Sequence, residues 1–209
     1  MRRCVILLDG AEKPEAMRRE LGKDDVLVAV DRAVDTCMAL DRAPAVAVLG
    51  DGTASEKATD WAAFSGVPRE EYRPRDGTSG LEVALEWALT SGDVTAVDIV
   101  NAFGRGPAED AARLLAFANL RTDTPVAILT AGQRITVLSG GYTLNGKQGL
   151  EFSLVPLDAG SAITVKNGKH DLVHRSLAPG SAVLLRQKLA SPTANLLVTS
   201  GRFLVYLPR

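Results

Sequence analysis

The sequence of 209 residues has little that would direct it to a membrane, an oxidising compartment or a polyanion. No apolar run approaches the roughly 18 residues that a membrane-spanning helix needs, and residues 4–8 are too few for a signal peptide. The two cysteines, Cys4 and Cys37, lie in apolar segments, which predicts buried thiols rather than a disulfide. The formal net charge of −1 predicts no broad basic surface for nucleic acid or acidic lipid. We therefore expect a soluble, cytoplasmic protein that binds neither nucleic acid nor membrane.

Residues 1–131 alternate between short apolar runs and helical patterns. The expected strands are residues 4–8, 26–30, 45–49, 71–73, 96–100 and 125–129, and the expected helices are residues 14–21, 33–40, 55–64, 81–89 and 108–120. Ser79 and Glu82 have the spacing of a capping box at the start of one of these helices. Continuous apolar strands separated by helices predict a parallel, doubly wound α/β sheet.

Residues 132–209 lose the helical period and consist of short runs, mostly rich in β-branched residues. The expected strands are residues 135–138, 150–155, 162–165, 182–187, 196–199 and 203–207. Turn sequences such as Asn145-Gly146 and Asn167-Gly168 separate them. This texture predicts a small antiparallel β-sandwich or barrel, so we expect an α/β domain of residues 1–131 followed by a β domain of residues 132–209.

Acidic residues, glycines and an asparagine follow the expected strands of the α/β half. They are Asp9, Gly10, Asp31, Gly50, Asp51, Asn101 and Gly104. Because the carboxyl ends of parallel strands meet at one edge of a sheet, these residues should converge there. Glycines let a phosphate approach the backbone, and carboxylates suit Mg²⁺. One interpretation is a crevice for a magnesium–nucleotide complex; the alternative is that Asp and Gly end strands as ordinary turn residues. Spacing alone leaves both open.

The order of these motifs resembles that of the thiamine pyrophosphokinases over nearly the whole chain. The matching segments are residues 7–10, 30–33, 50–54 (the family's Gly-Asp-Phe-Asp-Ser), 78–85 (Lys-Thr-Asp-Leu-Glu), 104–109 (Gly-Gly-Arg-Leu-Asp-His), 152–157 (Phe-Ser-Leu-Ile-Pro-Leu) and 200–207. The resemblance implies an α/β domain joined to a β-sandwich, and a homodimer with thiamine bound between one α/β half and the partner's sandwich. It further implies Mg²⁺-dependent transfer of the terminal diphosphate of ATP to thiamine, with release of AMP.

By the same resemblance, individual residues acquire expected roles. Asp31 and Asp51 would hold the metal and act in catalysis together with Arg105. The expected nucleotide-binding residues are Asp9, Gly10, Gly50, Asn101 and Gly104, and Ser191 would contact the thiamine pyrimidine.

The sequence departs from the family pattern at several catalytic positions. Thr53 and Gly80 stand where the family has aspartates, residues 108–109 replace its Asp-His pair, and residues 192–193 replace its Asn-Glu pair. Phosphoryl-type transfer depends on charge stabilisation by metal, so these losses weaken the expected site. The acidic residues that could compensate are Asp76, Glu82, Glu109 and Asp110.

Two hypotheses follow from this comparison: a working thiamine pyrophosphokinase with an unusual metal site, or a non-catalytic relative that binds thiamine or nucleotide or serves as a regulatory subunit. A pterin pyrophosphokinase with a different acceptor alcohol is a third option.

Overall fold

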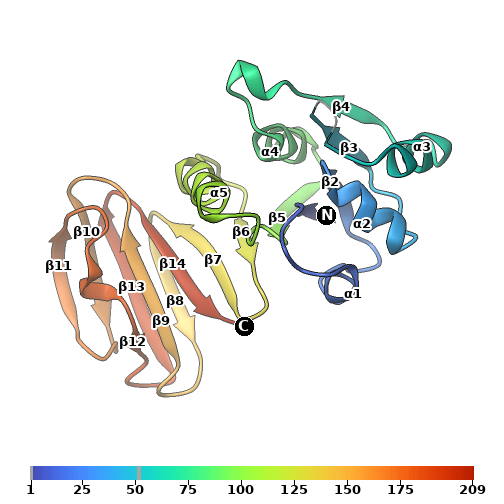
Figure 1. The fold of residues 1–209 in the computed structure, drawn as a ribbon. Helices are drawn as coiled ribbons and strands as arrows, with labels where there is room; N and C mark the ends of the chain where they lie inside the picture. The colour runs from blue at the N-terminus through green and yellow to red at the C-terminus, as the bar shows by residue number, and fades with distance from the viewer. Residues whose placement is uncertain (1, 51–52) are drawn as a thin grey trace. The chain divides into compact units, whose positions relative to one another are not determined.

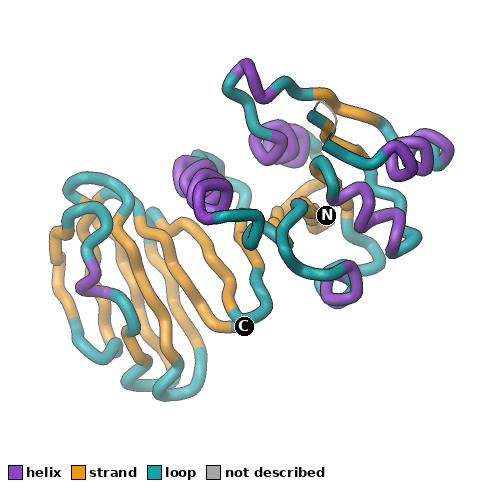
Figure 2. Tube along the Cα trace, in the orientation of Figure 1, coloured by secondary structure: helices purple, strands orange, loops and turns teal. Residues whose placement is uncertain are grey.

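The computed structural model describes residues 2–50 and 53–209, within two compact units, Met1–Thr130 and Ala131–Arg209. Figure 2 shows that the helices belong to the first unit, apart from one short helical turn in the second, and that strands run through both. None of the helices in the described ranges is long and apolar enough to cross a lipid bilayer.

The first unit is an α/β structure in which strands and helices alternate along the chain (Figure 1). Its strands are β1 (Arg2–Leu7), β2 (Val26–Val30), β3 (Val46–Leu49), β4 (Arg69–Glu71), β5 (Val94–Val100) and β6 (Val126–Leu129). Its helices are α1 (Pro14–Met17), α2 (Ala33–Ala39), α3 (Glu56–Phe64), α4 (Gly80–Thr90) and α5 (Pro107–Asn119), with a 3-10 turn, η1, at Pro74–Asp76. The predicted capping box is present, because Glu82 accepts from the backbone N–H of Ser79 at 2.8 Å and donates its own N–H to the Ser79 hydroxyl.

The strands of this unit are paired in parallel in the order β6-β5-β1-β2-β3-β4. The chain moves outward from β1 to β4 and then returns to the other side of β1 with β5. The carboxyl ends of β1 and β5 therefore form the topological switch point, where doubly wound sheets bind their ligands. The predicted doubly wound parallel sheet is confirmed.

Helices cover both faces of this sheet. Successive residues of β2 point to opposite faces, and Leu27 and Ala29 belong to the core cluster that includes residues of α1, α2 and α3. Val30 points the other way, toward Gly80 at the start of α4, which packs along β1, β2, β3 and β5. Cys4 and Cys37 are buried free thiols, as the sequence predicts, and burial raises the pKa of each thiol to about 12.

The second unit is a β-sandwich. Its strands are β7 (Gln133–Leu138), β8 (Gly141–Asn145), β9 (Glu151–Pro156), β10 (Ser161–Lys166), β11 (Leu172–Leu177), β12 (Gln187–Lys188), β13 (Thr193–Ser200) and β14 (Phe203–Pro208). They form two antiparallel sheets, β12-β9-β14-β7 and β11-β10-β13-β8. Phe152 and Phe203 from the first sheet share a buried core with Ile163 and Leu196 from the second, so the expected sandwich is confirmed.

Some expected elements of the second unit are wrong. Residues 182–187 do not form one strand, because Ala182–Leu184 is a 3-10 turn, η2, and only Gln187–Lys188 pairs with β9. Ser181 favours this turn by accepting the backbone N–H of Val183. The sequence reasoning also missed β8 and β11, whose residues are mostly exposed and so lack the apolar alternation of a half-buried strand.

Candidate functional site

The loops that follow β1 and β5 are joined at the switch point by Asn101. Its side chain accepts from the backbone N–H of Glu12 at 2.9 Å and donates to the carbonyl oxygen of Leu8 at 3.1 Å. The residue is 4% exposed and has φ 54°, a left-handed conformation that asparagine tolerates better than most residues. The side chain of Asn101, which was predicted to bind nucleotide, therefore links the two loops by hydrogen bonds.

Backbone hydrogen bonds also join the loop that follows β1 to the loop that follows β5. The N–H of Gly10 donates to the carbonyl of Asn101, and the N–H of Ala11 donates to that of Phe103, each at 2.9 Å. A β-carbon on Gly10 would collide with both of these carbonyl oxygens. Gly104 has a φ of 98°, and a β-carbon on it would collide with Cβ of Ala11. The two predicted glycines thus allow one loop to approach the other, and their roles toward a phosphate remain predictions.

Asp9 lies between two arginines. Its carboxylate, 12% exposed, accepts a hydrogen bond from Arg113 of α5 and lies 3.5 Å from Nε of Arg105. Arg113 also donates to the carbonyl oxygen of Ala102 at 2.8 Å, which fixes its guanidinium beside the β5 exit loop. Asp9 and Arg105 were both predicted site residues, and the structure brings them together. Arg113 completes this ion-paired cluster.

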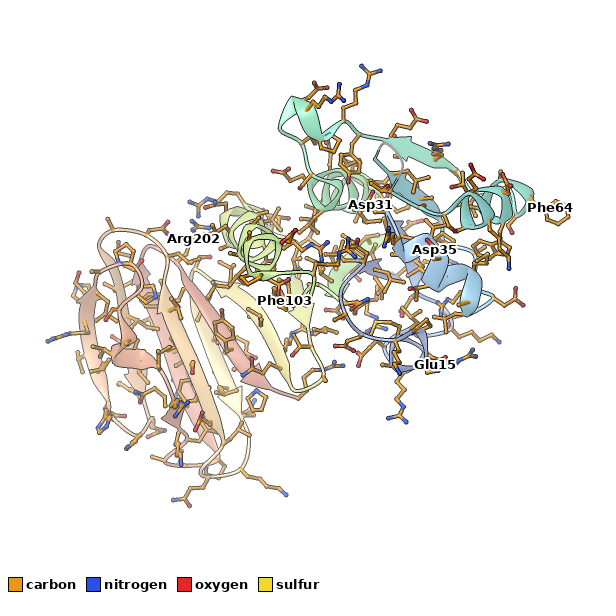
Figure 3. The ribbon with its side chains drawn as sticks, in the orientation of Figure 1. Glu15, Asp31, Asp35, Phe64, Phe103 and Arg202 are labelled. Carbon is orange, nitrogen blue, oxygen red and sulfur yellow. The ribbon has the colours of Figure 1, made fainter. Side chains whose placement is uncertain are left out.

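Asp31, labelled in Figure 3, directly follows β2, and neutral hydrogen-bond donors surround its carboxylate. Oδ1 accepts from the backbone N–H of Gly50 at 3.0 Å and from the hydroxyl of Thr53 at 2.7 Å. Oδ2 accepts from the hydroxyl of Tyr72 at 2.7 Å. Thr53 stands where the resemblance expects an aspartate, so a hydroxyl donor occupies the position of a second carboxylate.

Tyr72 reaches Asp31 through a gap between two glycines. A β-carbon on Gly50 would lie 2.9 Å from Cζ of the tyrosine ring, and one on Gly80 would lie 3.0 Å from Cε1. Burial raises the pKa of Tyr72, and the hydrogen bond to Asp31 raises it further. The phenol therefore keeps its proton and donates a hydrogen bond to Asp31 throughout the neutral pH range.

Two of the four acidic residues considered as replacements serve local structure. The Glu82 carboxylate is part of the α4 capping box. The Asp110 carboxylate accepts from the backbone N–H of Gly104 at 2.9 Å and so stabilises the loop before α5. The carboxylates of Glu82 and Asp110 therefore stabilise the starts of α4 and α5.

Two further predicted site residues are Ser191 and Asp51. Ser191 belongs to the second unit, where its hydroxyl donates to the carbonyl of Thr193 at 2.7 Å in a tight turn. Asp51, predicted as catalytic and metal-binding, lies outside the described residues. The expected proximity of Asp31 and Asp51 stays a prediction, as do the catalytic and binding roles of the other site residues.

A cavity of about 260 Å³ opens beside Asp31, between α4 and α5. It is lined mainly by apolar groups, with Asp31, Thr78, Ser79 and Arg113 as polar contributors and Tyr72 as its aromatic wall. The cavity lies at the carboxyl edge of the sheet, where the sequence predicts a ligand site.

The described residues do not fit the magnesium ion that the resemblance implies. Asp31 already accepts three hydrogen bonds and Asp9 is paired with two arginines. Across residues 2–50 and 53–209, no three histidine, cysteine, aspartate or glutamate side chains come together in a way that could hold a metal ion. No chemical step through a bound magnesium ion is therefore derived for this site.

Sequence reasoning missed Tyr72, which directly follows β4, and Arg113, which lies on α5. Tyr72 is the single aromatic residue in the charged segment 69–76, and Arg113 is the single arginine within α5. The available signals were one aromatic residue among charged ones and one basic residue on an alanine-rich helix.

The fold matches several solved structures over nearly the full length of the chain. A thiamine pyrophosphokinase from Bacillus subtilis aligns with a TM-score of 0.81 at 15% identity, covering 99% of each chain. One from Geobacillus thermodenitrificans aligns with a TM-score of 0.79 at 21% identity, covering 99% of this chain and 97% of that one. One from Candida albicans aligns with a TM-score of 0.72 at 13% identity, covering 99% and 88%.

Comparison of the amino-acid sequence with known families and curated proteins finds no match. The resemblance in the motifs is confirmed at the level of three-dimensional structure, and the chain has the fold of the thiamine pyrophosphokinases.

Proposed function

We propose that this protein is thiamine pyrophosphokinase-like and binds a thiamine compound or a nucleotide at the carboxyl edge of its parallel sheet, without transferring diphosphate. The observation that carries the proposal is the hydrogen bonding of Asp31, the residue that the resemblance assigns to metal and catalysis. Its carboxylate is occupied by donors from Gly50, Thr53 and Tyr72. Diphosphate transfer requires cations that neutralise charge developing on the phosphates, and carboxylates normally hold those cations.

The cavity beside Asp31 supports binding. Its volume of about 260 Å³ lies just below the lower bound of about 300 Å³ for small-molecule pockets. Its apolar walls suit a heteroaromatic ring, and the guanidinium of Arg113 offers planar N–H donors of the kind that recognise phosphate.

Calorimetry with thiamine, thiamine diphosphate and ATP tests binding. Ala112 is exposed on α5 and lines the cavity, whereas its exposed neighbour Ala111 does not. We expect at least one of the three compounds to bind the wild type and Ala111→Trp equally, and Ala112→Trp at least about tenfold more weakly. Absence of binding by all three compounds, or equal binding by the two tryptophan variants, would contradict the proposal.

Diphosphate transfer from Mg–ATP to thiamine is the second candidate, favoured by the near-complete coverage of the fold. An assay for AMP release from Mg–ATP and thiamine separates the two candidates. We expect no release above background. Turnover by the wild type that Asp51→Ala abolishes would establish the enzyme instead.

The resemblance also leads us to propose a cytoplasmic homodimer. Two buried free thiols are compatible with a reducing compartment. Light scattering at micromolar concentration tests the dimer, and a monomer would count against a thiamine site shared between two copies.

A further inference from the structure

The donors around Asp31 direct the positive ends of their dipoles at the carboxylate, in the positions that a bound cation would use. A hydroxyl hydrogen directs the positive end of its dipole at the carboxylate, and Thr53 and Tyr72 each do so at 2.7 Å. A magnesium ion would lie at about 2.0–2.1 Å from a carboxylate oxygen in near-octahedral geometry. The ion and a hydroxyl donor cannot both use the same lone-pair direction of one oxygen.

The space around Tyr72 links this arrangement to Gly50 and Gly80. A β-carbon on Gly80 would lie 2.6 Å from Cγ1 of Val30 and 3.0 Å from the tyrosine ring, and Gly50 faces the same ring at 2.9 Å. Any side chain at position 80 would therefore have to displace Val30 and press on the Tyr72 ring. The glycines at positions 50 and 80 thus leave the space in which Tyr72 reaches Oδ2 of Asp31, while Thr53 donates to Oδ1.

We propose that Thr53, Tyr72 and the two glycines form one unit that takes the place of a divalent cation at Asp31. Ligand binding at this edge of the sheet is then independent of magnesium. The arginines beside Asp9 supply the positive charge available to an anionic ligand.

Replacement of the cation at Asp31 deepens the proposed function, but it does not depend on which compound binds in the cavity. It can fail while a compound still binds in the cavity, and it can hold even where none of the tested compounds binds. The two sets of experiments therefore fail separately.

The first test titrates the ligand-free protein with MgCl₂ and with MnCl₂ in a calorimeter, using the wild type and Asp31→Asn. We expect the two proteins to give the same heats, because Asp31 is already satisfied by protein donors. A one-to-one divalent site in the wild type that is lost in Asp31→Asn would overturn the proposal.

The second test reverses the substitution at position 53. Thr53→Asp places a second carboxylate against Asp31, so we expect it to unfold at a lower temperature than the wild type in EDTA and to regain stability in magnesium. Its affinity for Mn²⁺ should exceed that of the wild type at least about tenfold. Thr53→Asn has the same shape without the charge, and its unfolding temperature should not respond to magnesium.

A folded Thr53→Asp, verified by circular dichroism, that shows no response to either cation would overturn the proposal. Should this variant fail to fold even in magnesium, the comparison of the wild type with Asp31→Asn decides alone.

Discussion

The ring of Tyr72 lies so close to Gly50 that a β-carbon at position 50 would come within 2.9 Å of it, and the ring is the neighbour that such an atom would meet. The glycine and the tyrosine therefore depend on each other. Gly50→Ala should destabilise the wild type by about 1–3 kcal/mol, the usual cost of overpacking.

The same substitution in a Tyr72→Ala background should be nearly neutral, because the clashing ring is gone. Urea denaturation of the four proteins in this double-mutant cycle measures the difference. Equal losses in both backgrounds would show that the glycine is required for its backbone conformation instead.

Asn101 should be among the least replaceable residues of the first unit. Asn101→Ala removes the hydrogen bonds to Glu12 and Leu8 and leaves buried backbone groups unpaired, which should cost about 2–3 kcal/mol. The variant also keeps the left-handed φ of 54°, which alanine adopts poorly.

Asn101→Gly is the matched control, since it loses the same hydrogen bonds without conformational strain. It should be less destabilised than Asn101→Ala by about 1 kcal/mol in urea denaturation. Wild-type stability in either variant would mean that the two loops are held together by other contacts.

The raised pKa of Tyr72 predicts a loss of stability in alkali. Burial and the Asp31 carboxylate both disfavour the phenolate, so the folded protein retains a proton that the unfolded chain releases above its ordinary pKa of 10.0. The associated stability is present below pH 10 and decreases as the pH rises further. Chemical denaturation of the wild type should show this decrease, and Tyr72→Phe should show less of it.

Asp31→Asn should lower the pKa of Tyr72 without restoring its ordinary value, because burial remains the larger cause. The near-ultraviolet absorbance of phenolate, measured with and without Tyr72→Phe, isolates this tyrosine from Tyr142 and Tyr206. An unchanged titration would show that Asp31 does not contribute to the pKa shift of Tyr72.

An acid-sensitive contact lies at the opposite end of the sheet, between Arg3 of β1 and Asp25 just before β2. Partial burial raises the pKa of Asp25, but the hydrogen bonds from Arg3 and from the backbone N–H of Gly22 lower it to a net value below the ordinary one. The stabilisation is therefore present above pH 4 or so and disappears as the pH falls through the folded-state pKa. Denaturation of the wild type and Asp25→Asn between neutral and acidic pH should converge as the pH falls; a constant difference would contradict this.

The sequence predicted most of the first unit well because its central strands are buried on both faces and its helices carry clear patterns; the exposed strand β4 begins two residues before the expected one. Val26–Val30 begins and ends where expected, and the Ser79–Glu82 capping box starts α4. Prediction failed in the second unit where burial no longer marks a strand. Leu172–Leu177 is an edge strand with mostly exposed residues, and its pairing with β10 arises from tertiary structure.

The same distinction applies to the site. Topology alone places Asp9, Asp31 and Asn101 at one edge, because each follows a parallel strand. Their hydrogen-bond partners could not be read from the chain. Tyr72 reaches Asp31 across 41 residues of sequence, and Arg113 reaches Asp9 across 104, through contacts that exist only once the sheet has formed.

Asn101 links the loops that follow β1 and β5, and this link affects how a ligand can fit at this edge of the sheet. Side-chain and backbone hydrogen bonds fasten one loop to the other, so the two loops resist separation. Differences in selectivity among related sequences should therefore arise from side chains on α5 that line the cavity, such as Ala112 and Ala116, more readily than from these two loops.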